Sequence, residues 1–325
     1  MKERWVKGMQ LTDVAAFSKK VRENIAKVII GKDQHINLML TALIAGGHVL
    51  LEDVPGTGKT VLARSLAKSI ACEFSRIQFT PDLMPSDVTG VSIFMPNKGE
   101  FEFKPGPVFT NILLADEINR ATPRTQAALL ECMEERQVTE SGITHVLPAP
   151  FLVIATENPV EIQGTFALPE AQLDRFLMRL KPGYPEGDEA VQILSRFISS
   201  DPMADLAPVA KREELLEAQA LVKEVMVSAP VLEYIAALCE QTRKFEQVIL
   251  GVSPRGMLAL MRAAQAYALV KGRAFVTPDD VKMLAAPVLA HRIVIRGMYG
   301  KADATKALIG EALKAVPVPT EDIHQ

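Results

Sequence analysis

The sequence predicts an α/β protein, with a parallel-sheet core in its first part and a domain of helices in its second. Short apolar runs at 49–51, 112–115 and 151–155 each lead into polar residues, as buried parallel strands do where their carboxyl ends face a site. Beyond residue 183, apolar residues recur mainly at the spacing of helices. Strands therefore belong to the first part of the chain, and helices fill the second.

Composition and charge fit a folded protein of two domains that acts in the cytoplasm. The 325 residues are 48% hydrophobic and 23% charged, with a formal net charge of −3 that disfavours nucleic acid as a partner. Cys72, Cys132 and Cys239 lack any metal-binding spacing, so we interpret them as reduced thiols. No apolar signal segment is visible, and the apolar stretch 38–51 is shorter than the roughly 20 residues that span a bilayer.

The elements of the first domain can be predicted in chain order. Apolar side chains at helical spacing predict an amphipathic helix over 11–30, and a second helix over 61–70 follows the first strand. Five prolines between residues 80 and 109 exclude an uninterrupted helix, so this segment is expected to be an insertion. Residues 137–145 alternate around a Ser-Gly pair and predict a hairpin that precedes the third strand.

A cluster of Lys, Pro and Gly at 181–187 predicts the boundary between the domains. We therefore expect one domain over residues 1–183 and a second over 184–325. Within the second domain, Ser253-Pro254 and Thr277-Pro278 have the sequence of helix starts, in which a capping residue precedes a proline.

Residues 53–60 (DVPGTGKT) form a candidate phosphate-binding loop, which we call the phosphate loop. Glycines let backbone N–H groups converge on an anion, the next helix adds its positive end, and a lysine reaches the outer phosphates. The strict pattern has glycine where this chain has Asp53, but the flanking strand and helix support the interpretation. The residues expected to bind the nucleotide are Pro55, Gly56, Thr57, Gly58, Lys59, Thr60 and Val61, with Thr60 also a ligand of Mg²⁺.

Polar residues at the ends of the other two strands complete a candidate hydrolytic site. Asp116 and Glu117 end the second apolar run, where Asp116 is suited to bind the metal and Glu117 to activate water. Asn158 follows the third run, where its amide is suited to hold the attacking water or to contact the γ-phosphate. Together with the phosphate loop, these residues predict a nucleoside triphosphatase that uses Mg²⁺.

In this order the motifs resemble those of the AAA+ ATPases, and within them the MoxR group of the helix-2-insert branch. The resemblance covers about residues 20–295 and rests on 28–31 (VIIG), 51–60 (LEDVPGTGKT), 115–121 (ADEINRA) and 168–176 (LPEAQLDRF). It implies an AAA+ P-loop parallel-sheet core with a C-terminal all-helical lid domain. MoxR-like proteins are also similar to this chain in tolerating a residue other than glycine at position 53.

The same resemblance implies roles for residues that the spacing alone does not single out. Asn158 would be sensor 1, and the segment 80–109 would contain the helix-2 insert. Arg175 matches the arginine finger, which stabilises charge on the nucleotide of a neighbouring subunit, and Arg255 looks like sensor 2 in the first turn of a lid helix. The residues implied to cradle the adenine are Val28, Ile29, Ile30 and Gly31.

The roles of some charged residues near these motifs can be interpreted in more than one way. Apolar positions over 173–180 predict a helical stripe with Arg175 on its opposite side, which an ordinary surface arginine would also show. Arg120 and Arg124 are either intersubunit contacts or charges on a helix surface. The family often has Gln where this chain has Glu157, so an additional carboxyl lies beside Asn158.

The resemblance implies a homohexamer that hydrolyses ATP and acts as a chaperone or remodelling factor for a protein partner. MoxR-like proteins are associated with partners that carry a von Willebrand factor A domain, and with maturation of complexes or metal insertion. A magnesium-chelatase-like motor subunit and a nucleic-acid motor or transcription activator remain alternatives, although residues 81–87 lack the Gly-Ala-Phe-Thr-Gly-Ala loop of sigma-54 activators. A nucleotide switch without turnover is a further alternative, against which Glu117 and Arg175 argue.

Overall fold

The computed structural model describes residues 9–52, 54, 56–158, 164–198, 201–297 and 302–319. They belong to two compact units. The sheet unit comprises the described parts of Val21–Ile36 and Gly46–Val209, and the helical unit those of Met1–Lys20, Asn37–Ala45 and Ala210–Gln325. The boundary between the two units falls inside the first helix, and the division into domains at residue 183 remains a prediction.

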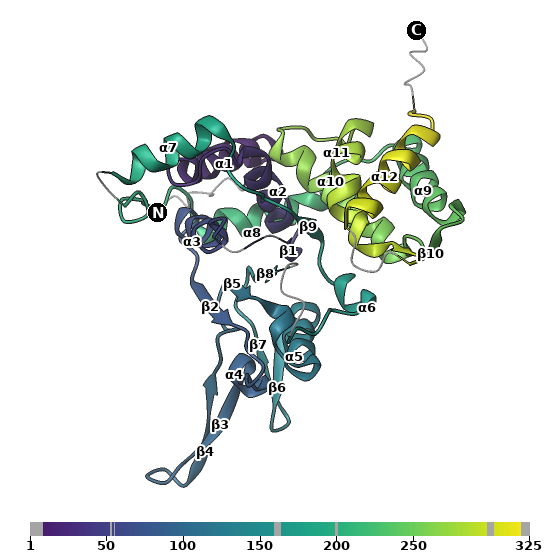
Figure 1. Cartoon of the computed structure of the whole chain (residues 1–325). Helices are drawn as coiled ribbons and strands as arrows, with labels where there is room; N and C mark the ends of the chain where they lie inside the picture. Colours follow the sequence, from purple (N-terminus) through teal and green to yellow (C-terminus); the bar gives the residue numbers. More distant parts are fainter. Residues whose placement is uncertain are drawn as a thin grey trace, which may run out of the picture. The chain divides into compact units, whose positions relative to one another are not determined.

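A five-stranded parallel sheet in the order β2-β5-β8-β1-β9 forms the centre of the sheet unit (Figure 1). The three apolar runs form its three inner strands, which are buried up to their last residues. This confirms the predicted α/β class. The strands are β1 (Val49–Glu52), β2 (Phe74–Gln78), β5 (Ile112–Asp116), β8 (Leu152–Glu157) and β9 (Met178–Leu180).

Helices and a 3-10 turn surround this sheet or connect its strands. Helix α3 packs against β2 and β5, and α5 packs against α4 and β6. These elements are α3 (Lys59–Ser69), η1 (Ile118–Arg120), α5 (Pro123–Glu135), α6 (Glu170–Leu173) and α7 (Gly187–Phe197), whereas α1 (Leu11–Ala26) is divided between the two units and α2 (Asp33–Ile44) belongs mainly to the helical unit. Helix α1 ends at Ala26, before residue 30, where the sequence predicted its end. The Arg196 guanidinium donates hydrogen bonds to the carbonyls of Ala26 and Lys27 and so satisfies acceptors at this end.

Two hairpins project from the sheet unit (Figure 1). The segment expected to be an insertion forms α4 (Pro85–Thr89) and the antiparallel pair β3 (Gly90–Met95) and β4 (Glu100–Pro105). The second hairpin, β6 (Gln137–Glu140) and β7 (Ile143–Val146), confirms the prediction for 137–145 and turns through Ser141 and Gly142, both at positive φ. The Phe103 ring of β4 stacks on the His145 ring of β7 with centroids 3.9 Å apart, so the two hairpins are joined.

The helical unit begins its helices as the sequence predicted. The Ser253 hydroxyl accepts a hydrogen bond from the Gly256 N–H at 3.2 Å, and Thr277 and Asp280 form a capping box. A short ribbon of β10 (Val248–Leu250) and β11 (Val294–Ile295) accompanies the helices. The helices are α8 (Arg212–Leu221), α9 (Ala229–Lys244), α10 (Pro254–Val270), α11 (Pro278–Leu289) and α12 (Ala302–Ala315). Within the described residues, no helix has the length and apolar character that crossing a membrane requires.

One buried histidine joins four elements at the amino ends of the strands. His48 precedes β1, and its Nδ1 accepts the Val153 N–H of β8 at 2.9 Å, so Nε2 carries the proton and donates to the Met133 carbonyl of α5 at 3.0 Å. The His48 carbonyl accepts the Leu177 N–H at 2.8 Å, immediately before β9. Burial, and next the charge of Arg136, lower the pKa of His48 from 6.5 to about 3.

This histidine predicts a loss of stability in mild acid. Between pH 6.5 and 3 the unfolded chain binds a proton at His48 that the folded chain excludes, so the free energy of unfolding falls as the pH falls through this window. The contribution is up to roughly 5 kcal/mol, since one unit of pKa difference corresponds to about 1.4 kcal/mol. Urea unfolding at several pH values should show this slope, and His48→Gln should be less stable at pH 7 with a shallower slope. An equally steep slope in the variant would contradict the assignment.

Candidate active site

The phosphate loop presents backbone donors at the start of α3. Gly56 and Gly58 have φ values of 85° and 83°, which side chains disfavour, and Gly58 is the N-cap of α3. No side chain caps this helix, so its first N–H groups point into the loop and suit an anion. Asp53 and Pro55 lie outside the described residues.

The side chains of the phosphate loop converge on one carbonyl. Lys59 Nζ donates to the Val54 carbonyl at 3.1 Å, and the Thr57 hydroxyl donates to the same oxygen at 3.3 Å. Thr60 and Val61 follow in the first turn of α3, where both are half-buried. The Lys59 side chain thus folds back over the phosphate loop, in which it is expected to bind the outer phosphates.

A threonine that the motifs did not single out holds Asp116, the last residue of β5, and Glu117, which follows it. The Thr156 hydroxyl, on β8, donates to Asp116 Oδ1 at 2.7 Å and accepts the Glu117 N–H at 2.8 Å. Its side chain is only 1% exposed, and a polar residue inside a buried strand was the available signal in the sequence. Arg76 pairs with the other oxygen of Asp116 at 2.7 Å.

Glu117 has an uncommon backbone conformation and two polar partners. Its φ is 55°, a left-handed value that non-glycine residues adopt uncommonly. Gln78 Nε2 donates to Glu117 Oε2 at 2.8 Å, and Arg120 Nε lies 3.3 Å from the same oxygen. Arg120 therefore contacts Glu117 within its own chain, whereas Arg124 is exposed on α5.

The oxygen donors of this site suit Mg²⁺ bound together with phosphate. The described residues contain no group of three His, Cys, Asp or Glu side chains that would hold a metal by themselves. The hydroxyl of Thr60 and the carboxylate of Asp116 are hard donors, which Mg²⁺ accepts when phosphate and water supply its remaining ligands. The residues therefore fit the ion that the phosphate loop implies.

Asn158 lies buried immediately after β8, at the same edge of the sheet as the phosphate loop and Asp116. The strand before it ends in Glu157. Burial, and next the charge of Glu52, raise the pKa of Glu157 from 4.5 to about 7, and the charge of Arg179 opposes this rise. The carboxyl that departs from the family pattern is thus close to half protonated at neutral pH.

The turn at 28–31, the predicted adenine cradle, packs against a later part of the sheet unit. Val28 is buried, while Ile29 and Ile30 are half-buried. Gly31 has a φ of 71°, and a Cβ there would lie 2.0 Å from the Glu189 carboxyl. A side chain at this position would therefore require both a strained backbone and a shift of α7 or of Glu189.

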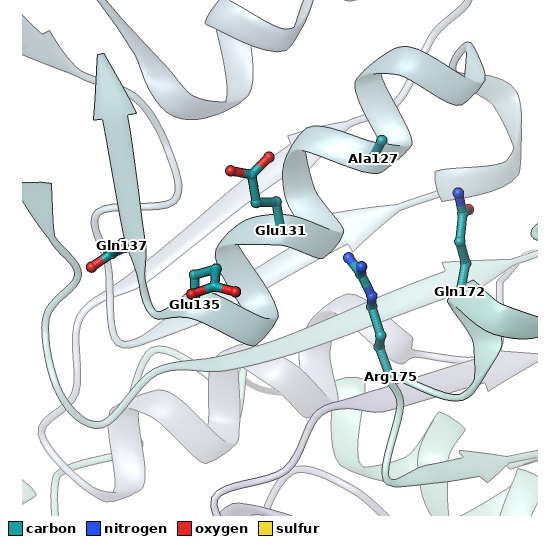
Figure 2. Close-up of a pocket in the computed structure, with 6 residues that line it drawn as sticks. All are labelled: Ala127, Glu131, Glu135, Gln137, Gln172 and Arg175. Carbon is teal, nitrogen blue, oxygen red and sulfur yellow. The ribbon is translucent and has the colours of Figure 1, made fainter. Parts of the chain in front are cut away.

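The prediction of a helix over 173–180 is wrong. Helix α6 ends at Leu173 and β9 begins at Met178, because the Leu177 N–H donates to the His48 carbonyl of the sheet and not to a preceding turn. Arg175 lies between them, and its Nε is 3.0 Å from Glu134 Oε2. Arg175 lines a cavity of about 470 Å³ together with Ala127, Glu131, Glu135, Gln137 and Gln172. Figure 2 shows its side chain pointing toward α5.

The structure brings most of the predicted residues to one edge of the sheet unit. The ends of β1, β5 and β8 are neighbours, so the phosphate loop, Asp116, Glu117 and Asn158 all start from adjacent strands. Arg255 belongs to the helical unit, where it is exposed in the first turn of α10.

Comparisons with known proteins agree with this arrangement. Residues 48–178 match the ATPase family associated with various cellular activities (AAA), and residues 240–311 match the AAA lid domain. The chain is 51% identical to the uncharacterized protein YeaC of Bacillus subtilis, over 93% of this chain and 95% of that protein. It is 42% identical to the chaperone MoxR1 of Mycobacterium tuberculosis, over 83% of this chain and 74% of that protein. The crystal structure of a putative ATPase from Cytophaga hutchinsonii has a TM-score of 0.85 and 38% identity, covering 95% of this chain and 98% of that one.

Replacing Thr156 by the isosteric valine should damage both stability and turnover. The change leaves the Glu117 N–H and one oxygen of Asp116 without a partner, which costs about 1–3 kcal/mol in the free energy of unfolding. Turnover of Mg²⁺–ATP should fall at least about ten-fold because the two carboxylates lose their fixed positions. Thr144→Val, on the exposed face of β7, is the matched control. Equal unfolding and phosphate-release data for the two variants would refute the role of the hydroxyl.

Proposed function

Since this chain belongs to the MoxR family of AAA+ ATPases, we propose that it hydrolyses ATP to ADP and phosphate and drives an oligomeric chaperone cycle. The observation that carries the proposal is the Thr156 hydroxyl, which fixes Asp116 and Glu117 at the strand edge that also carries the phosphate loop. A carboxylate held beside a phosphate-binding helix start is the arrangement that hydrolysis of a phosphoanhydride needs.

The proposed chemistry divides between binding and activation. The first N–H groups of α3 and Lys59 hold phosphate oxygens, and Thr60 and Asp116 hold Mg²⁺. The metal ion, when bound, neutralises charge on the phosphates. Glu117 accepts a proton from the attacking water, and Asn158 orients that water or the γ-phosphate.

Arg175 supports an oligomer, which we propose to be a homohexamer. Its side chain is 30% exposed and its guanidinium pairs with Glu134 of the same chain, so it can exchange this partner for a charged group that arrives from outside. In the proposed ring that group is the γ-phosphate bound to the neighbouring subunit.

The exposed apolar side chains of the two hairpins favour a protein as the client. Phe94 and Phe101 are 50% and 72% exposed, and their rings lie 5.3 Å apart on one face of the β3–β4 hairpin. Ile143 and Val146 are exposed on the second hairpin. Exposed apolar surface of this kind suits protein contacts. The β3–β4 hairpin balances Glu100 and Glu102 with Lys98 and Lys104, so it offers no basic patch for nucleic acid. We propose a client linked to a von Willebrand factor A domain, in the maturation of a complex or in metal insertion.

The substitution Glu117→Gln should separate binding from hydrolysis. The amide keeps the size of the side chain but accepts no proton, so ATP should bind while steady-state phosphate release falls by at least about 100-fold. Glu100→Gln, an exposed position on β4, provides the control for loss of one charge. A rate for Glu117→Gln close to that of the unaltered protein would exclude Glu117 as the base.

Mixing two inactive variants tests whether Arg175 acts in a neighbouring subunit. Arg175→Ala keeps Glu117, and Glu117→Gln keeps Arg175, so a mixed ring rebuilds complete sites where the two chains meet in the right order. Equal mixing should restore roughly a quarter of the sites, because each of the two conditions holds at about half of the positions in a cyclic ring. Measured phosphate release that stays at the level of the separate variants would count against action between subunits.

A further inference from the structure

Two carboxyl groups meet where β1 and β8 end. Glu52 and Glu157 are the last residues of these parallel strands and are direct partners in the register. Side chains of paired residues on neighbouring strands point to the same face of a sheet. The phosphate loop begins one residue after Glu52, and Asn158 follows Glu157, so the pair precedes both of these parts of the candidate site.

Glu52 has cationic neighbours and still lacks a hydrogen-bond donor on one oxygen. Lys181 Nζ lies 3.2 Å from its Oε1, and Arg179 Nε lies 3.4 Å from its Oε2. The residue is 8% exposed, and within the described part of the chain its Oε2 is buried without a hydrogen bond. A buried carboxylate oxygen of this kind requires a donor, because an unmet acceptor in the interior costs free energy.

Glu157 is the group that can supply this donor. No cation pairs with its carboxyl among the described residues, and burial together with the charge of Glu52 raises its pKa to about 7, against the opposing charge of Arg179. On the other side of β8, the carboxylate of Asp116 at the end of β5 is already engaged by Thr156 and Arg76. The proton on Glu157 is therefore most favourably placed between the two glutamates.

We propose that Glu157 is a positioning residue for ATP hydrolysis, whose protonated carboxyl donates a hydrogen bond to Oε2 of Glu52 and so ties the phosphate loop to Asn158. The inference rests on the proposed ATPase function. Loss of the proton leaves two neighbouring buried carboxylates, which repel each other at the ends of β1 and β8. The segments that follow then lose their common anchor, and Asn158 leaves its working position.

The pH dependence of turnover tests this role. Between pH 6.5 and 8.5, kcat of the unaltered protein should fall by up to about 25-fold, since a group with a pKa near 7 changes from mostly protonated to about 3% protonated. Glu157→Gln carries an amide donor at every pH, so its ratio of kcat at the two pH values should be near one. Glu100→Gln, the exposed control, should keep the steep ratio of the unaltered protein.

A second variant and a direct measurement separate the possible failures. Glu157→Leu has no donor and no charge, and its kcat should be low at both pH values. NMR of carboxyl-labelled glutamate should show a resonance that titrates near pH 7 and disappears in Glu157→Gln. An ATPase whose alkaline decline is the same in Glu157→Gln would overturn the positioning role alone. No ATPase in the unaltered protein at any pH, with the titration still present, would overturn the proposed function and the positioning role together.

Discussion

A neutral imidazole at the amino ends of the strands is the constraint on which the candidate site depends. His48 accepts a backbone N–H of β8, donates to α5 and, through its own carbonyl, receives the N–H that leads into β9. Each contact fixes one element relative to β1 and so helps to set the register of the strands. In this register Glu52 is the direct partner of Glu157, and Asp116 ends the neighbouring β5 at the same edge of the sheet. Protonation would place an N–H on Nδ1, facing the Val153 N–H, which cannot accept a hydrogen bond, and burial of the ring also disfavours the charge.

Hydrogen bonds between strands then convert this common edge into a site. Thr156 belongs to β8 but acts on β5, where it holds Asp116 and the backbone of Glu117. The left-handed φ of Glu117 is retained because the hydroxyl of Thr156 and the side chains of Gln78 and Arg120 hold both its backbone and its carboxylate. Strain at this residue is thus balanced by contacts from two neighbouring strands and from η1.

Local patterns in the sequence were sufficient for features that depend on neighbours along the chain. The inner strands, the β6–β7 hairpin and the helix starts at Ser253 and Thr277 follow from apolar spacing and from capping chemistry. Periodicity failed over 173–180, where a hydrogen bond to distant His48 turns a helical pattern into a strand. The roles of His48 and Glu52 arise between strands that are far apart in sequence, so no local pattern could indicate them. For Thr156 the polar residue inside an apolar run was a signal, but its partners Asp116 and Glu117 lie on another strand and in the turn after it.

The stacking of Phe103 on His145 makes a mechanical unit of two hairpins that are separate in sequence. Phe103 also makes an edge-to-face contact with Phe109, so two aromatic contacts fix the position of β4. A polypeptide that displaces Phe101 on the exposed face of β4 therefore also displaces β7. Strand β7 pairs with β6, which contacts α5. Helix α5 begins just after η1, the turn that follows Glu117. Contact at the hairpins and the geometry of the acidic residues are thus connected through packed elements of one unit.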